Sequence, residues 1–256
     1  MNCKLCGEVV LKIQSHLILN KYDVSYFQCK RCGLIFTENP YWIDEAYSSA
    51  IAAQDTGIIQ RNIINARNVS RILHALQDRN GIYLDYGGGP GTFVRLMRDK
   101  GYDFLWYDKY SMPIFSKGFE YRGQDLTATT AFEVFEHLVD VKEEIEKMLD
   151  TSDFLLFSTI CYDKKITPPP TDWWYFVYEE GQHVAFYSEQ TFRYLAKEYN
   201  RSYYKIMGYH VLASKQVSKF KLIYLNLLNL FYKYIIDRKK FVYCVEDMKT
   251  INNLLH

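Results

Sequence analysis

The chain has 256 residues, and its 31 basic and 30 acidic side chains leave a formal charge of +1. This balance removes bulk electrostatics as an argument for nucleic-acid or membrane binding, although a local basic patch is compatible with it. Hydrophobic residues make up 48% and charged residues 24%, which excludes a disordered, collagen-like or low-complexity chain. The length fits one medium α/β domain with a small attachment, and the N-terminus lacks the apolar stretch of a secretory signal, so we expect a cytoplasmic protein.

Four of the six cysteines form two close pairs, Cys3 with Cys6 and Cys29 with Cys32, and a glycine follows each pair. Four thiolates at this spacing predict a structural zinc site with a closed tetrahedral shell and no open catalytic position. Two disulfides or a redox pair are the alternatives, and a reducing compartment disfavours disulfides. We expect residues 1–40 to form a zinc-ribbon-like module that depends on the metal for folding, because so short a segment buries little apolar surface.

Residues 41–80 contain apolar side chains at helical spacing between Ile59 and Leu76, and the pattern ends before Gly81. We interpret this segment as a bridging helix that packs on the core without a chemical role. Residues near Tyr47 could still fold over a bound ligand.

From residue 82 onward, short apolar runs alternate with amphipathic segments, which is typical of a parallel sheet covered by helices. One of these segments, residues 138–149, places its apolar side chains on one face and is predicted to pack on the sheet as a helix. The predicted strands are residues 82–84, 104–107, 126–132 and 154–157.

A glycine-rich loop, Asp85-Tyr86-Gly87-Gly88-Gly89-Pro90-Gly91, follows the first of these strands and precedes a predicted helix. The spacing lacks the third small residue of a dinucleotide fingerprint and the Gly-Lys-Ser/Thr of a phosphate loop. Its D-x-G-x-G-x-G pattern instead resembles the first motif of class I S-adenosylmethionine (SAM) dependent methyltransferases. The resemblance implies a Rossmann-like seven-stranded sheet with helices on both faces over residues 81–256. It also implies that Gly87, Gly88, Gly89 and Gly91 face the methionyl part of SAM, and that Asp85 lies near its amino group.

The second predicted strand ends at Asp108, 19 residues after Gly89, where a carboxylate can accept hydrogen bonds from both ribose hydroxyls. The alternative is an ordinary carboxylate at the end of a surface strand. Lys109 is expected beside the adenine edge, and Asp125 is a further candidate for the adenine. Phe132 and Glu133, at the end of the fourth strand, complete the expected SAM-binding residues.

The segment from Glu133 to His137 carries an E-x-x-E-H pattern that ends with Glu136 and His137. It resembles the segment of small-RNA 2′-O-methyltransferases and ubiquinone-pathway O-methyltransferases in which these side chains bind a divalent cation. His183, which precedes an aromatic strand, is similar to the fourth ligand of the RNA enzymes. A cation would activate a hydroxyl acceptor. Two alternatives stay open: His137 or His183 acts as a general base oriented by Glu133 or Glu136, or the pair only caps the strand-to-helix turn.

Three consecutive prolines at 168–170 precede Trp173, Trp174 and Tyr175. Prolines stiffen a loop and aromatic faces stack on sugars or bases, so this segment is a candidate substrate lid. The alternative is a packed loop that clamps the edge of the sheet.

The C-terminal region contains strand-like residues at 203–212 and 241–245 and an apolar helix at 220–236. The strands are expected to complete the sheet. The helix has too few consecutive uncharged residues to span a bilayer, so we expect a buried helix or one that forms a homodimer contact. Surface association with a membrane is a minor alternative, because lysines flank the apolar stripe.

Taken together, the sequence predicts a SAM-dependent methyltransferase with structural zinc and a catalytic divalent cation as a further candidate. The favoured reaction is O-methylation of a small hydroxyl- or phosphate-bearing metabolite, such as a nucleotide-activated sugar or a surface-polysaccharide precursor. RNA ribose methylation, sugar C-methylation and an idle SAM-binding module are the alternatives.

Overall fold

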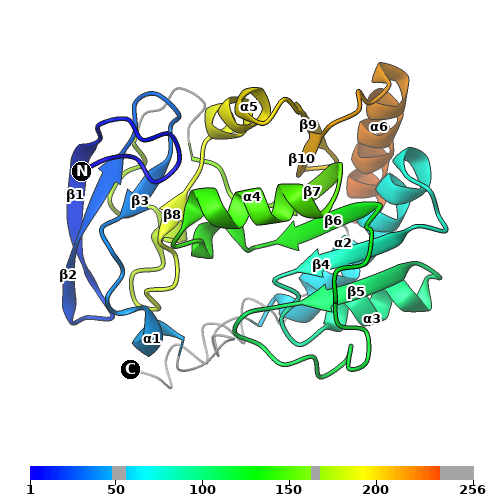
Figure 1. The fold of residues 1–256 in the computed structure, drawn as a ribbon, viewed down its shortest axis with the longest axis horizontal. Helices are drawn as coiled ribbons and strands as arrows, with labels where there is room; N and C mark the ends of the chain where they lie inside the picture. Colours follow the sequence, from blue (N-terminus) through cyan, green and yellow to red (C-terminus); the bar gives the residue numbers. More distant parts are fainter. Residues whose placement is uncertain (48–55, 163–167, 237–256) are drawn as a thin grey trace. The chain divides into compact units, whose positions relative to one another are not determined.

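The structure is a computed structural model that describes residues 1–47, 56–162 and 168–236 (Figure 1). The chain divides into two compact units, and each is treated separately below. Unit 1 contains Met1–Ser49, Ala131–Tyr204 and His210–Lys215, and unit 2 contains Ala50–Thr130, Lys205–Tyr209 and Gln216–His256.

Unit 1 begins with an antiparallel hairpin of β1 (Leu11–Ile18) and β2 (Tyr22–Gln28). Strand β3 (Ile35–Thr37) pairs with β2, and the two-residue strand β8 (Ala185–Phe186) pairs with β3. A segment from the second half of the chain thus completes the N-terminal sheet, whose order is β1-β2-β3-β8.

Unit 1 also contains two longer helices and several short ones, which surround an aromatic core. Helix α4 (Val141–Thr151) buries Val141, Ile145 and Met148, as its spacing predicted. Helix α5 (Glu189–Glu198) begins after Ser188, whose hydroxyl accepts a hydrogen bond from the Thr191 backbone and caps the helix. The short helices are α1 (Ile43–Ala46), η1 (Phe135–His137) and η2 (Trp174–Phe176).

Unit 2 is built on the parallel pair β4 (Ile82–Tyr86) and β5 (Asp103–Tyr107), with Ile82 opposite Asp103 and Tyr86 opposite Tyr107. Helix α2 (Ile58–Leu76) is the helix predicted before Gly81, and it packs against α3 (Thr92–Asp99). Helix α3 starts at the end of the glycine-rich loop, as expected for a strand–loop–helix motif.

Strand β6 (Ala128–Phe132) continues the sheet. Its first residues pair in parallel with β4 inside unit 2, and the strand then runs into unit 1. Inside unit 1, β7 (Phe154–Ser158) pairs antiparallel with β10 (Tyr209–Ala213). The hydrogen-bonded order of the six strands is β5-β4-β6-β7-β10-β9, which confirms the predicted mixed α/β sheet.

Residues 203–212 form two strands rather than one, namely β9 (Ser202–Ile206) and β10. The physical reason is a tight turn at Met207 and Gly208, which both have positive φ (54° and 93°). The predicted strand at 241–245 lies outside the described residues. Between Asp103 and Ala128, residue Glu120 forms an isolated parallel bridge with Trp106.

Helix α6 (Lys219–Ile236) packs on α2 within unit 2 and buries Leu225. Of the two expectations for this helix, burial is wrong, because Phe220, Ile223 and Leu227 are between 58% and 85% exposed, and a contact with a second subunit stays a prediction. No helix in the described parts of the chain combines the length and hydropathy needed to span a bilayer.

Candidate functional site

The four paired cysteines come together in unit 1. Their sulfur atoms all lie within 4.8 Å of one another. The shortest contacts, Cys3 to Cys32 at 3.6 Å and Cys6 to Cys29 at 3.4 Å, each join one sulfur from each pair. Tetrahedral zinc with Zn–S bonds of ~2.3 Å separates its sulfurs by ~3.8 Å, whereas a disulfide needs ~2.05 Å. The cluster therefore fits a zinc ion better than two disulfides.

The backbone supports this arrangement with two similar turns. The Gly7 N–H donates to the Cys3 carbonyl at 3.0 Å, and the Gly33 N–H donates to the Cys29 carbonyl at 2.9 Å. The contact between Cys3 and Cys32 lowers the pKa of Cys3 to about 5 and raises the pKa of Cys32, and burial raises the pKa of Cys6 to about 11. One thiolate of the cluster is therefore favoured without a metal, and a bound cation would be needed to stabilise the others.

The glycine loop, residues 85–91 of unit 2, is pressed against β5. A Cβ on Gly88 would lie 2.7 Å from Trp106 Cδ1 and 3.0 Å from Asp85 Oδ2, so only glycine fits there. Gly89 has φ +52°, and a Cβ on it would meet no atom within 4 Å. The loop thus has one face packed on the protein and one open position that a ligand can approach.

Asp85 lies beneath this loop at the end of β4 and is only 3% exposed. Thr130 Oγ1 donates a hydrogen bond to its Oδ1 at 2.9 Å. Burial raises the pKa of Asp85 to about 7, and the charge of Asp108 acts in the same direction. A cationic ligand group near this carboxyl would favour its ionised form.

Asp108 fixes the open side of the loop. Its Oδ2 accepts the Gly89 N–H at 2.9 Å, and its Oδ1 accepts the N–H groups of Tyr110 and Ser111 at 2.7 and 2.8 Å. The Trp106 indole also donates to the Gly89 carbonyl at 2.9 Å. Sequence reasoning missed Trp106, because an aromatic residue in a buried strand carries no signal of a hydrogen bond to a loop.

The other residues predicted to bind SAM are less enclosed. Lys109 is exposed, with its ammonium 5.2 Å from the centre of the Tyr110 ring, and Asp125 is exposed in the segment before β6. Phe132 is the half-buried last residue of β6, and Glu133 follows it with φ +53°, a strained conformation for a residue with a side chain.

A second cluster of potential ligands occurs in unit 1. Glu136 and His137 lie on η1, and His183 precedes β8. One ligand atom from each lies within 4.8 Å of the others, and these three residues are called the Glu–His cluster below. Glu133 is not one of the three, and its Oε1 accepts a hydrogen bond from Ser158 Oγ at 2.5 Å. Its charge raises the pKa of His183, against the larger opposing effect of burial.

Hydrogen bonds orient the two imidazoles. His183 Nδ1 lies 2.7 Å from the Tyr175 carbonyl, and a carbonyl only accepts, so this Nδ1 carries the proton and His183 Nε2 keeps its lone pair. His137 Nδ1 lies 3.2 Å from the Gln182 carbonyl and 2.9 Å from the Tyr47 hydroxyl, which can donate or accept, so either nitrogen of His137 can carry the lone pair. Burial lowers the pKa of both histidines, that of His137 to about 3, so both are neutral at pH 7.

Glu136 is 1% exposed, and Tyr175 donates a hydrogen bond to its Oε1 at 2.6 Å. Its Oε2 is buried and has no hydrogen-bond partner within the described segments. Such a group is costly unless a ligand satisfies it. An unsatisfied carboxylate oxygen beside two imidazole lone pairs is a donor set that suits a divalent cation.

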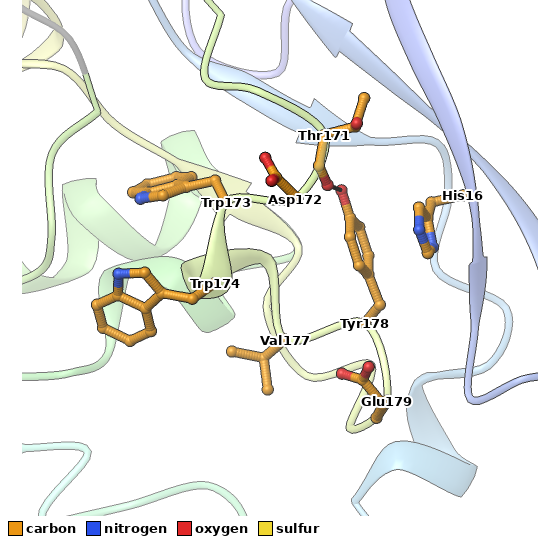
Figure 2. A pocket seen from close by; sticks show the side chains of 8 residues that line it. All are labelled: His16, Thr171, Asp172, Trp173, Trp174, Val177, Tyr178 and Glu179. Carbon is orange, nitrogen blue, oxygen red and sulfur yellow. Dashed lines mark hydrogen bonds between the residues drawn. The ribbon is translucent and has the colours of Figure 1, made fainter.

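Tyr175 organises this cluster from η2. It is 3% exposed, its hydroxyl bonds Glu136, and its carbonyl accepts the proton of His183. The sequence predicted Tyr175 as part of a substrate lid, and this position shows a supporting contact that no local pattern revealed. Its neighbours Trp173 and Trp174 line a pocket (Figure 2), and Trp174 is 68% exposed.

The chain matches one family model and is similar to several solved structures. A family model described as a methyltransferase domain matches residues 59–204. Among solved structures, the chain is similar to human N-acetylserotonin methyltransferase in complex with SAM, at 12% identity over 70% of this chain and 67% of that chain, with a TM-score of 0.44. It is also similar to an O-methyltransferase family 2 protein from Planctomyces limnophilus in complex with apigenin, at 13% identity over 68% of this chain and 65% of that chain, with a TM-score of 0.46. No curated protein matches the chain.

Proposed function

Since the chain belongs to the family of methyltransferase domains, we propose that it is a SAM-dependent O-methyltransferase. Its acceptor is a small metabolite with a hydroxyl or phosphate oxygen, such as a nucleotide-activated sugar or a surface-polysaccharide precursor. The observation that carries the O-methyltransferase proposal is the Glu–His cluster, in which one ligand atom from each of three residues converges and the buried Glu136 Oε2 has no hydrogen-bond partner among the described residues.

Unit 2 holds the cofactor in this proposal. SAM, when bound, supplies a methyl group on a positively charged sulfur. Asp85 binds its amino group from beneath the glycine loop, and the open position at Gly89 admits its methionyl part. Asp108 accepts the ribose hydroxyls while it continues to hold the Gly89 N–H. Lys109 and Asp125, which also belong to unit 2, complete the site, and the SAM contacts of Phe132 and Glu133 stay predictions from the sequence.

Unit 1 activates the acceptor. Glu136, His137 and His183, together with Glu133, hold a divalent cation, which when bound lowers the pKa of a coordinated acceptor oxygen. The convergence of three ligand atoms, and the Tyr175 carbonyl that keeps His183 Nε2 unprotonated, support this role. A general-base role is less well supported, because a histidine with a pKa of about 3 accepts a proton poorly at neutral pH.

The organisation of the chain is part of the same proposal. Residues 1–40 form a zinc module held by Cys3, Cys6, Cys29 and Cys32, residues 41–80 bridge it to the catalytic part, and residues 81–256 form the SAM-dependent domain. The zinc is structural, because four thiolates leave no position for a substrate. The cytoplasmic location and the homodimer stay predictions from the sequence.

The acceptor class is tested with methyl-labelled SAM and a cell extract separated into small-metabolite, RNA, protein and lipid fractions. We expect label in the small-metabolite fraction. The label should disappear with EDTA and return with Mg²⁺ or Mn²⁺. Label in RNA alone would replace the proposed acceptor with RNA, and tight SAM binding without any label would favour an idle binding module.

Variants separate the two sites. Glu136→Gln and His183→Ala should each lower the rate of transfer at least 100-fold and leave the Kd for SAM within about twofold. Glu143→Gln is the matched control, because Glu143 is an exposed residue of α4 that pairs with Lys147. Full transfer by His183→Ala would remove the Glu–His cluster from the mechanism.

A further inference from the structure

A pocket of about 300 Å³ in unit 1 lies beside η2 (Figure 2). The aromatic side chains of Trp173, Trp174 and Tyr178 line it, together with Asp172 and Glu179. Small-molecule sites span ~300–1,000 Å³, so this volume suits a ligand of one ring rather than a dinucleotide.

One wall of the pocket is rigid. The Tyr178 ring stacks on His16, with centroids 3.6 Å apart and planes 3° apart, and its other neighbour Phe176 stacks at 5.1 Å. The Tyr178 hydroxyl accepts a hydrogen bond from Gln14 Nε2 at 2.9 Å and donates one to the Thr171 carbonyl at 2.8 Å. Because both the ring and the hydroxyl of Tyr178 are held in place, this side chain loses little conformational entropy when a ligand binds.

The backbone beside this wall is strained. Val177, which also lines the pocket, has φ +46° and ψ +54°. A β-branched residue is rarely found in the left-handed region, and backbone strain of this kind clusters at active sites, ligand clamps and switch regions. The strain is an observation independent of the aromatic side chains, and it points to the same pocket.

The pocket is acidic. Asp172 and Glu179 both line it, and within the described residues no ion pair involves either carboxylate. No lysine or arginine is among its described lining residues. Two carboxylates beside aromatic faces attract a cation and repel a phosphate.

The pocket wall connects to the Glu–His cluster through rings inside unit 1. Trp174 contacts Tyr175 with centroids 5.4 Å apart, and Tyr175 contacts His183 at 4.8 Å. The same short helix therefore supplies an aromatic wall of the pocket and the hydroxyl that bonds Glu136.

From these observations, we propose that the pocket binds a sugar ring that carries a protonated amine, as the recognition element of the acceptor. The apolar face of the ring stacks on Trp174, and the ammonium group pairs with Asp172 and Glu179. This inference rests on the proposed function for its link to methyl transfer, but the binding itself can be measured without SAM.

The test follows the indole N–H signals of the ¹⁵N-labelled full-length protein during titration with three probes at pH 6.5. Glucosamine has both the ring and the amine, glucose has only the ring, and Nα-acetyl-lysine amide has only the amine. We expect glucosamine to shift the Trp174 signal with a Kd at least fivefold lower than that of either other probe.

Variants assign the two contributions. The double variant Asp172→Asn/Glu179→Gln should remove the preference for glucosamine over glucose, and Trp174→Ala should weaken binding of both sugars at least fivefold, as read from the Trp173 signal. Glu143→Gln and Phe220→Ala are control substitutions of exposed residues. They should change neither the preference for glucosamine over glucose nor the affinity for the two sugars. Equal binding of glucose and glucosamine, equal binding of the lysine amide, or no shift with 50 mM glucosamine would overturn the proposal.

The outcome is distinguishable from failure of the proposed function. Glucosamine binding without transfer of label to any metabolite leaves the pocket assignment intact and removes the methyltransferase activity. Transfer of label to metabolites without glucosamine binding would support the methyltransferase activity and overturn the pocket assignment.

Discussion

Gly88 is the residue at which the glycine loop tolerates least change. A methyl group there would lie 2.7 Å from Trp106 Cδ1, and Trp106 is held by its own hydrogen bond to the Gly89 carbonyl. We expect Gly88→Ala to lower the free energy of unfolding by ~1–3 kcal/mol, as overpacking does, and to weaken SAM binding more than tenfold. Urea unfolding and calorimetric titration with SAM measure the two effects.

Gly101→Ala is the matched control for that substitution. Gly101 has φ +83°, and a Cβ on it would meet no atom within 4 Å. The free energy of unfolding of the Gly101→Ala variant should fall by ~1–2 kcal/mol through backbone strain alone, and its affinity for SAM should be unchanged. Equal SAM affinities in the two variants would contradict the role given to the close packing at Gly88.

Asp85 is expected to make stability depend on pH. Its pKa is about 7 in the folded protein and ~3.9 in an unfolded chain, so the folded state retains a proton that the unfolded state releases between these values. The contribution of Asp85 to the free energy of unfolding is therefore fully present below pH 4 and is lost as the pH rises to about 7. Relative to Asp85→Asn, the free energy of unfolding of the parent protein should fall by ~2–3 kcal/mol between pH 5 and pH 8.

Urea unfolding at both pH values measures this difference. Asp99→Asn is the control, because Asp99 is an exposed residue of α3 that pairs with Arg95. If Asp85→Asn and the parent protein change stability in parallel between the two pH values, the raised pKa of Asp85 is wrong.

At the scale of elements, we expect the strands β1, β2 and β3 to depend on the zinc ion proposed for the cysteine cluster. Chelation of zinc should leave four sulfurs within 4.8 Å of one another without a counter-charge. We expect hydrogen exchange to accelerate at least tenfold in β2 and β3 and to change little in β4 and β5, because the latter lie in unit 2. Mass spectrometry before and after chelation measures both regions, with one zinc released per chain.

A substitution provides the control for chelation, which also strips other metals. Cys6→Ser should reproduce the faster exchange in β2 and β3, whereas Glu136→Gln should not. Unchanged exchange after Cys6→Ser would show that the N-terminal strands are stable without the metal.

At the scale of the whole molecule, the features predicted from the sequence are those that depend on residue type at fixed chain spacing. The glycine loop, Asp108 after β5 and the two cysteine pairs belong to this class. The pairing of β3 with β8 could not be predicted in this way. Strand β8 has only two residues, which is too short for a strand pattern of its own, and it is defined by its pairing with β3.

The same limit applies within the candidate site. Glu136 and His137 are adjacent in the sequence and could be predicted together. Tyr175 contacts both Glu136 and His183 across 39 and 8 residues of chain, and its role follows from packing that no local pattern encodes. Chemistry at strand ends is therefore readable from sequence, and the side chains that orient it are not.

Binding of SAM should stabilise unit 2 as a whole, because β4 and β5 pair with each other and the glycine loop lies between β4 and α3. A ligand that binds only the folded state at 100 times its Kd raises the free energy of unfolding by about 2.7 kcal/mol. Urea unfolding with and without SAM should therefore show an increase of this size, and the slowest amides of β4 and β5 should gain equal protection from hydrogen exchange. Protection gained by β4 alone would contradict cooperative unfolding of these two strands.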